Sequence, residues 1–177
     1  MIIHLSAFRN FTENFYMQKD SSKHTYFMQM AIDLAAANLK NGSGGPFGAV
    51  IVKNGVVVGK GSNQVTSTND PTAHAEVVAI RDACKNLHTY QLEDCEVYAS
   101  CEPCPMCLGA IYWSRAKKLY FAADREDAAE AGFDDSYIYQ QVPLMPEKRD
   151  INSVQLMKPQ AVKVFKQWIE SEQKIKY

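Results

Sequence analysis

One imidazole, one carboxylate and two thiols stand close together in the middle of the sequence. His74 and Glu76 are separated by a single residue, and Cys104 and Cys107 follow after room for a strand and a loop. Zn²⁺ binds imidazole and thiolate well, and a catalytic zinc takes three protein ligands and keeps one position for water. His74, Cys104 and Cys107 supply three ligands, and Glu76 is a candidate general acid/base beside them. The pattern therefore predicts a catalytic zinc site.

The same residue types also allow a structural metal site. Cys101 is the only nearby residue that could serve as a fourth protein ligand, and it would close the position that water needs. The chain would then be a zinc-stabilised binding module in which Glu76 is dispensable. We favour the catalytic interpretation, because Glu76 lies two residues after a ligand and Pro103 precedes Cys104.

His74 with Glu76, and Cys104 with Cys107, are both predicted at the start of a helix. An Asp-Pro pair precedes a helical pattern over about residues 72–86, and two prolines open a second one over about residues 104–114. Helix N-termini carry partial positive charge, which favours thiolate over thiol. Cys104 and Cys107 are three residues apart, so they are expected on one face of their helix.

The other patterns predict a three-layer α/β domain. An amphipathic helix is expected between the capping residues 20–22 and the Asn-Gly pair at 41–42, followed by a hairpin around the Asn-Gly turn at 54–55. Continuous apolar runs in that hairpin indicate strands covered on both faces. Later patterns predict strands near residues 95–100, 118–122 and 153–157, short helices near 125–131 and 137–141, and a last helix from 159 to about 174.

Length, composition and charge restrict the class of protein. The 177 residues suffice for one domain, which we place at residues 23–177, after an extension of residues 1–22 that lacks a clear period and is expected to be poorly ordered. Hydrophobic residues make up 46% and charged residues 22%, as in ordinary globular proteins. A net charge of -1 gives no general attraction to nucleic acid or to anionic membranes.

Cysteine usage and the absence of export signals indicate a cytoplasmic protein. The five cysteines are odd in number and three are crowded together, which favours metal binding in a reduced compartment over disulfides. Residues 1–8 lack the features of a signal peptide, and no stretch is long and apolar enough to span a membrane. A small, nearly neutral substrate fits these features.

Four motifs carry a resemblance to a known family. They are GGPFGAV at residues 44–50, NDPTAHAE at 69–76, SCEPCPMC at 100–107 and AGFDD at 131–135. The chain resembles the cytidine deaminase superfamily and, within it, the guanine deaminases of the small zinc type. The resemblance covers residues from about the first helix to the C-terminus. It implies a three-layer α/β/α sandwich with a central mixed sheet of about five strands, one Zn²⁺ in each active site, and hydrolysis of guanine to xanthine and ammonia in purine salvage or catabolism.

The resemblance also assigns roles to individual residues. It implies that His74, Cys104 and Cys107 bind the zinc and that Glu76 delivers protons to N3 and to the departing amino group. It further implies that a set of residues contacts the purine base, namely Phe47, Asn63, Ala75, Asp134 or Asp135, and Tyr177.

Three of these contacts have simpler alternatives in the residues themselves. Asn63 alone would be read as the cap of a turn, and Asp134 or Asp135 as the cap of the following helix. A separate argument favours the carboxylates, with Asp135 ahead of Asp134: guanine presents two adjacent N–H donors, so a selective site needs a strong acceptor. Tyr177 has the weakest case, because chain ends are usually loose.

The resemblance extends to assembly. Small guanine deaminases resemble one another in forming homodimers that exchange C-terminal segments, which brings a terminal Tyr over the partner's site. Tyr177 ends this chain, and residues 142–152 could act as the hinge of an exchanged segment at 142–177.

Two other activities remain open at this stage. A guanosine deaminase would share the AGFDD motif and differ only in having room for a ribose. A tRNA adenosine deaminase would share the zinc helices, but it should carry a basic surface, and this chain is slightly acidic. The favoured hypothesis is a guanine deaminase without nucleic-acid or membrane partners.

Overall fold

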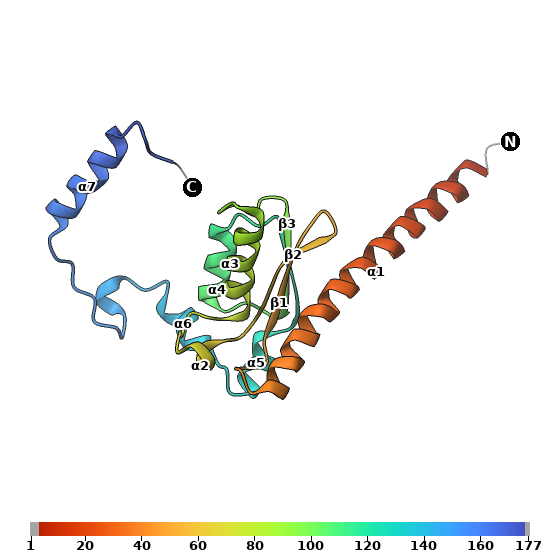
Figure 1. The fold of residues 1–177 in the computed structure, drawn as a ribbon, viewed down its shortest axis with the longest axis horizontal. Helices are drawn as coiled ribbons and strands as arrows, with labels where there is room; N and C mark the ends of the chain where they lie inside the picture. Colours follow the sequence, from red (N-terminus) through yellow and green to blue (C-terminus); the bar gives the residue numbers. More distant parts are fainter. Residues whose placement is uncertain (1–3, 176–177) are drawn as a thin grey trace. The chain divides into compact units, whose positions relative to one another are not determined.

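The computed structural model describes the backbone of residues 4–175 and the side chains of residues 22–175. The chain divides into two units, residues 1–133 and 134–177. The first unit contains α1 (His4–Asn41), β1 (Gly48–Lys53), β2 (Val56–Ser62), α2 (Val65–Thr68), α3 (Ala75–Leu87), β3 (Cys95–Cys101), α4 (Pro105–Trp113), β4 (Lys118–Ala123) and α5 (Arg125–Glu130) (Figure 1). The second contains α6 (Ser136–Gln141), the 3₁₀ helix η1 (Pro146–Lys148) and α7 (Lys158–Glu170).

A mixed sheet in the order β2-β1-β3-β4 forms the centre of the first unit. β1 pairs antiparallel with β2 and with β3, whereas β3 and β4 run parallel. The predicted hairpin is confirmed, and its turn residues Asn54 and Gly55 both have positive φ angles of 51° and 81°, as the Asn-Gly pair favours. The expectation of about five strands is wrong, because the sheet of the described chain has four.

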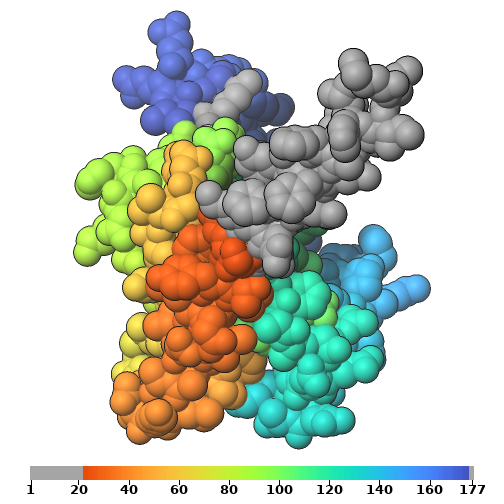
Figure 2. Space-filling view, turned by 90° about the vertical axis from the view of Figure 1, so that its right-hand side faces the viewer, coloured from red at the N-terminus to blue at the C-terminus, as the bar shows by residue number. Residues whose placement is uncertain are grey.

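Helices cover both faces of this sheet, which confirms the three-layer α/β/α architecture (Figure 1). Alternate residues of β1 point to opposite faces: Ala49 and Ile51 pack with the α3 side, and Val50 and Val52 with the α1 side. All four are fully buried. The predicted covering of the hairpin strands on both faces therefore holds for β1. Figure 2 shows the outer face of residues 22–41 of α1, with the region of β4 and α5 beside it.

The first helix ends as predicted and begins earlier. α1 ends at Asn41, where Gly42 takes a φ of 62°, a conformation that glycine adopts without strain. Its backbone helix starts at His4 and runs through the predicted caps at residues 20–22. The side chains before Ser22 lie outside the described part, so the proposed extension at residues 1–22 stays a prediction.

The second unit consists of short helices joined by irregular chain. α7 confirms the predicted last helix, and its apolar side chains Phe165, Trp168 and Ile169 are exposed. The strand predicted near residues 153–157 is wrong: these residues are exposed, have no regular secondary structure and are not part of the sheet of the described chain. A strand needs a neighbouring backbone for its hydrogen bonds, and sequence pattern alone does not supply one.

Candidate active site

His74 occupies the N-cap of α3, so the helix begins one residue later than the imidazole. The prediction placed this start near residue 72. Instead the carboxylate of Asp70 accepts hydrogen bonds from the backbone N–H (2.8 Å) and the hydroxyl (2.6 Å) of Thr72, which forms a turn ahead of the helix. His74 therefore has extended backbone angles, with φ -69° and ψ 156°, while Glu76 lies in the first helical turn.

The first turn of α3 lies directly against β2. A methyl group at Gly61 would collide with the carbonyl oxygen of Ala75 and with the backbone nitrogen of Ala79. The absence of a side chain at Gly61 therefore lets the backbone that carries His74 and Glu76 approach the sheet. Ala75 itself is buried.

The second helix start repeats this geometry. Cys104 is the N-cap of α4 with extended backbone angles, and Pro105 occupies the first helical position. Cys107 follows on the same face one turn later and is fully buried. The predicted placement of the zinc ligands at the N-termini of two helices is thus confirmed.

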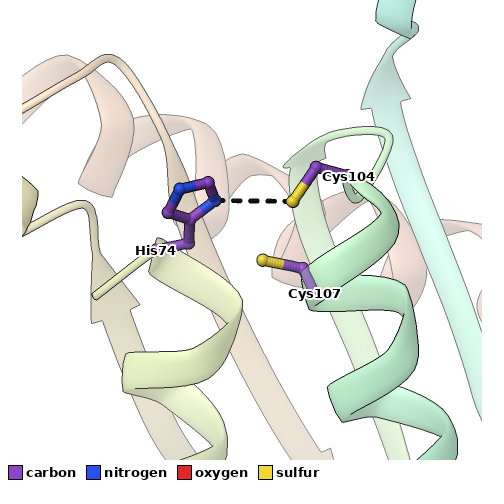
Figure 3. Close-up of side chains that lie close together, drawn as sticks. All are labelled: His74, Cys104 and Cys107. Carbon is purple, nitrogen blue, oxygen red and sulfur yellow. Dashed lines mark hydrogen bonds between the residues drawn. The ribbon is translucent and has the colours of Figure 1, made fainter. Parts of the chain in front are cut away.

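The two helix starts bring three metal-binding atoms together. The ligand atoms of His74, Cys104 and Cys107 all lie within 4.8 Å of one another, and Nδ1 of His74 is 3.5 Å from Sγ of Cys104 (Figure 3). Ligand atoms on a tetrahedral zinc are separated by about 3.6 Å, given the usual zinc–sulfur and zinc–nitrogen bond lengths. One imidazole and two thiols at these separations fit a zinc with a fourth position left for water.

Cys101 is outside this cluster of described ligand atoms. Its thiol donates to the carbonyl oxygen of Asp124 at 3.4 Å, and burial raises its pKa to about 11. The thiol of Cys101 is thus engaged with a backbone carbonyl outside the group of three ligand atoms. The arrangement therefore favours a site with three protein ligands over a structural site with four.

The electrostatic environment separates the two thiols of the cluster. A hydrogen bond from the thiol of Cys107 is the largest influence on Cys104 and lowers the pKa of Cys104 to about 4, with His74 acting in the same direction. The pKa of Cys107 is raised, first by its hydrogen bond to Cys104 and then by burial. His74 has a raised pKa because its ring bonds to Cys104. The hydrogen bond thus favours thiolate at Cys104 and thiol at Cys107, and a zinc bound by both sulfur atoms would displace the proton of Cys107.

Glu76 is the buried carboxylate beside the cluster. Its side chain is 8% exposed, and burial is the main cause of its raised pKa. A raised pKa makes a carboxyl group hold a proton more readily, which suits a general acid/base.

Phe47 and Asn63 lie where the loop of residues 42–47, which joins α1 to β1, meets the end of β2. The backbone N–H of Asn63 donates to the carbonyl oxygen of Phe47 at 3.1 Å. Oδ1 of Asn63 accepts from the backbone N–H groups of Gly45 (3.3 Å) and Val65 (3.2 Å). Since both partners are donors, the amide orientation is fixed with Oδ1 toward the backbone.

The nitrogen Nδ2 of Asn63 is available to a ligand. Asn63 is 7% exposed, and its described hydrogen bonds all use Oδ1 or the backbone. The described side chains contain no buried polar atom without a partner, so Nδ2 is open to solvent. Sequence pattern alone favoured a turn cap for Asn63. The structure assigns the capping to Oδ1 and leaves two N–H donors for another task.

Asp134 and Asp135 belong to the second unit. Oδ1 of Asp134 accepts from the backbone N–H of Ser136 at 2.8 Å, and hydrogen bonds with Ser136 lower the pKa of Asp134. Asp135 is the N-cap residue of α6. Their predicted contacts with the substrate remain predictions, and Tyr177 lies outside the described residues.

Sequence reasoning assigned no role to Asn38, which the structure connects to the loop of Phe47. Asn38 lies in the apolar stripe of α1 and is 4% exposed. Its only signal in the sequence is a polar residue at a position where the helical period expects an apolar one.

The fold and the ligand cluster together define a zinc-binding α/β domain. Residues 21–123 match the model of the cytidine and deoxycytidylate deaminase zinc-binding region, which is more than half of the chain. The chain belongs to this family of hydrolytic deaminases.

Individual relatives narrow the comparison. The chain is 53% identical to guanine deaminase of Bacillus subtilis over 154 residues, which span 87% of this chain and 99% of that protein. The crystal structure of that enzyme aligns with a TM-score of 0.85 at 52% identity, over 87% of this chain and 98% of the crystallised one. The tRNA-specific adenosine deaminase of Aquifex aeolicus is 45% identical over 98 residues, which span 55% of this chain and 64% of that protein. No helix in the described residues is long and apolar enough to cross a membrane.

Proposed function

We propose that this chain is a zinc-dependent guanine deaminase, which converts guanine and water to xanthine and ammonia. The observation that carries the proposal is similarity to a guanine deaminase over 99% of that protein's length, whereas similarity to the tRNA adenosine deaminase of Aquifex covers 64% of it. The similarity to the guanine deaminase extends beyond the zinc-binding region, which ends at residue 123.

The residues at the metal cluster divide the chemical work. His74, Cys104 and Cys107 would hold zinc, which when bound supplies a Lewis acid that makes water a nucleophile near neutral pH. Glu76 takes one proton from the attacking water and passes it to N3 of the purine. It then takes the second proton, from the hydroxyl group added at C2, and passes it to the amino group, which departs as ammonia and leaves a carbonyl at C2. Burial of Glu76 supports this role, because it makes the carboxyl group a better proton carrier.

The groups at the loop orient the base. Nδ2 of Asn63 donates to an acceptor on the purine, and the ring of Phe47 packs on its plane. Phe133 contacts Phe47 in an edge-to-face arrangement, with ring centroids 4.9 Å apart and planes at 86°. Asp135, or else Asp134, accepts from the N–H edge of guanine, and the backbone N–H of Ala75 completes the contacts. A site that hydrogen-bonds these groups rejects bases that lack them.

Ammonia release from a set of substrates tests this function. Zinc-loaded protein is offered guanine, guanosine, adenosine, cytidine and tRNA, with protein freed of zinc by a chelator as the control. We expect release from guanine alone and none from the metal-free protein. Release from guanosine would show that the nucleoside, and not the free base, is the substrate. Release only from tRNA would favour the activity of the tRNA-specific adenosine deaminases, which are similar to this chain over part of their length.

We further propose that the enzyme is a cytoplasmic homodimer whose subunits exchange residues 142–177. Two features support the exchange. α7 has no buried residue among its thirteen and exposes Phe165, Trp168 and Ile169. β4 lies at an edge of the sheet, so its backbone can accept a further strand. Five free cysteines support a reducing compartment.

Complementation tests the exchange directly. In an exchanged dimer, one site combines Glu76 of one subunit with Tyr177 of the other. Glu76→Gln protein and protein lacking Tyr177 would each have low activity, and co-refolding them should restore one complete site in each mixed dimer. A monomer by analytical ultracentrifugation, or a mixture without restored activity, would contradict the exchange.

A further inference from the structure

Asn38 links the first helix to the loop that carries the base-binding residues. Its amide nitrogen donates to the carbonyl oxygen of Gly45 at 2.8 Å and to the carbonyl oxygen of Asn63 at 2.9 Å. Both N–H groups of the amide are therefore used, and they join two segments that are far apart in the sequence. A buried amide is costly unless its hydrogen bonds are made, so this pairing fixes the position of all three segments.

The same two segments are also joined to each other. Oδ1 of Asn63 accepts from the backbone N–H of Gly45, whose carbonyl oxygen is one of the two acceptors of Asn38. Gly44 packs so closely on Asn63 that an added methyl group would collide with the carbonyl oxygen of Asn63. Asn38 thus closes a ring of hydrogen bonds that begins and ends in the neighbourhood of Phe47 and Nδ2 of Asn63.

We propose that Asn38 is a positioning residue for substrate binding. It holds residues 44–47 against Asn63, and so it sets the distance and angle between the ring of Phe47 and the free N–H donors of Asn63. The inference rests on the proposed function, in which these two groups contact the non-reacting part of guanine. Asn38 is a residue of α1, whereas the metal ligands and Glu76 belong to the starts of α3 and α4.

Because Asn38 lies apart from the metal ligands and Glu76 in the fold, its substitution should affect KM and kcat differently. We expect the contacts with the non-reacting part of guanine to be equally strong in the ground state and in the transition state. The loss of such uniform binding raises KM and leaves kcat nearly unchanged. A residue needed only for stability would instead lower the melting temperature without changing KM.

Asn38→Leu removes both donors and keeps a side chain that branches at Cγ. We expect the KM for guanine to rise about tenfold, kcat to stay within about threefold, and zinc content to be unchanged. Asn86→Leu is the control, because Asn86 is an exposed helix residue that also donates to a strand carbonyl oxygen, that of Val58, at 2.9 Å. The control should leave KM unchanged. Asn38→Ser, a smaller change, should give an intermediate KM if Asn38→Leu does not fold.

A double mutant shows whether Asn38 acts through Asn63. The rise in KM caused by Asn38→Leu should be smaller in an Asn63→Ala background, because part of what Asn38 positions is already lost. Fully additive changes in log KM would overturn the inference, as would an unchanged KM in an Asn38→Leu protein whose wild type turns over guanine. Wild-type protein that releases no ammonia from guanine would overturn the proposed function, and this inference with it.

Discussion

The metal cluster and the base-binding loop, by which we mean residues 44–47 together with Asn63, are built in different ways. His74, Cys104 and Cys107 are brought together by two helix starts, and each helix start is specified by the residues next to it in the sequence. Phe47 and Asn63 are held by hydrogen bonds between segments that are distant in the sequence, with Asn38 of α1 at the centre. The first arrangement depends on local chain geometry and the second on tertiary contacts.

This difference separates the consequences of damage. Changes at the metal cluster should affect zinc occupancy and kcat, because these residues touch the reacting atoms. Changes at the loop should affect KM and the choice of base, because these residues touch parts of the substrate that do not react. Each experiment below tests whether the two regions are separable in this way.

Loss of a metal ligand should have the largest effect. We expect Cys107→Ser to abolish stable zinc binding and to remove turnover in proportion to the zinc lost, since a hydroxyl is a poor substitute for thiolate. Cys101→Ser is the matched control, because both thiols are buried and only Cys107 is in the cluster. Metal analysis of the purified proteins checks both. Zinc loss from Cys101→Ser would show a four-ligand site.

Glu76→Gln should lower kcat by about 10²–10⁴-fold, the range typical for removing a general acid/base. Gln cannot carry the proton, but it matches the size of Glu, and the zinc ligands stay intact. Zinc content equal to wild type, with lost turnover, is the expected result. A variant with full function would favour the zinc-stabilised binding module.

The sequence predicts the metal cluster better than the base-binding loop, because the first depends on local chain geometry and the second on tertiary contacts. The ligands and their helix starts could be predicted because motif and geometry lie in contiguous residues. The start of α3 was misplaced by about three residues, since Asp70 hydrogen-bonds to Thr72 instead of capping the helix. The role of Asn38 could not be predicted, because its acceptors lie outside its helix, and one of them, the carbonyl oxygen of Asn63, is 25 residues away in the sequence. The missing fifth strand has a similar cause: a strand requires a partner that pattern does not reveal.

Asn63→Asp isolates the donor function of the loop. The carboxylate keeps an acceptor for the N–H groups of Gly45 and Val65, and it removes the N–H groups of Nδ2. We expect the KM for guanine to rise about tenfold or more, with an unchanged melting temperature and zinc content. Asn63→Ala, which loses both functions, should also lower the melting temperature. Equal KM values for Asn63→Asp and wild type would remove Asn63 from the substrate contacts.

A pair of glycines on opposite faces of the sheet gives the smallest and most specific test. Gly61 lies against α3, where an added methyl group would meet the carbonyl oxygen of Ala75, and Gly48 lies against α1, where it would meet that of Ala31. Gly61→Ala and Gly48→Ala should each cost about 1–3 kcal/mol of stability through overpacking.

Beyond this shared cost, the two substitutions should differ in kind. Gly61→Ala displaces the turn that carries His74 and Glu76, so we expect weaker zinc retention and a lower kcat. Gly48→Ala displaces α1 beside Phe47, so we expect a higher KM with zinc retained. Gly109→Ala is the control, because an added methyl group there meets no atom within 4 Å. Equal changes in zinc retention and in KM in both variants would contradict the separation of the two regions. A shift on either face of the sheet would then affect both the metal cluster and the base-binding loop.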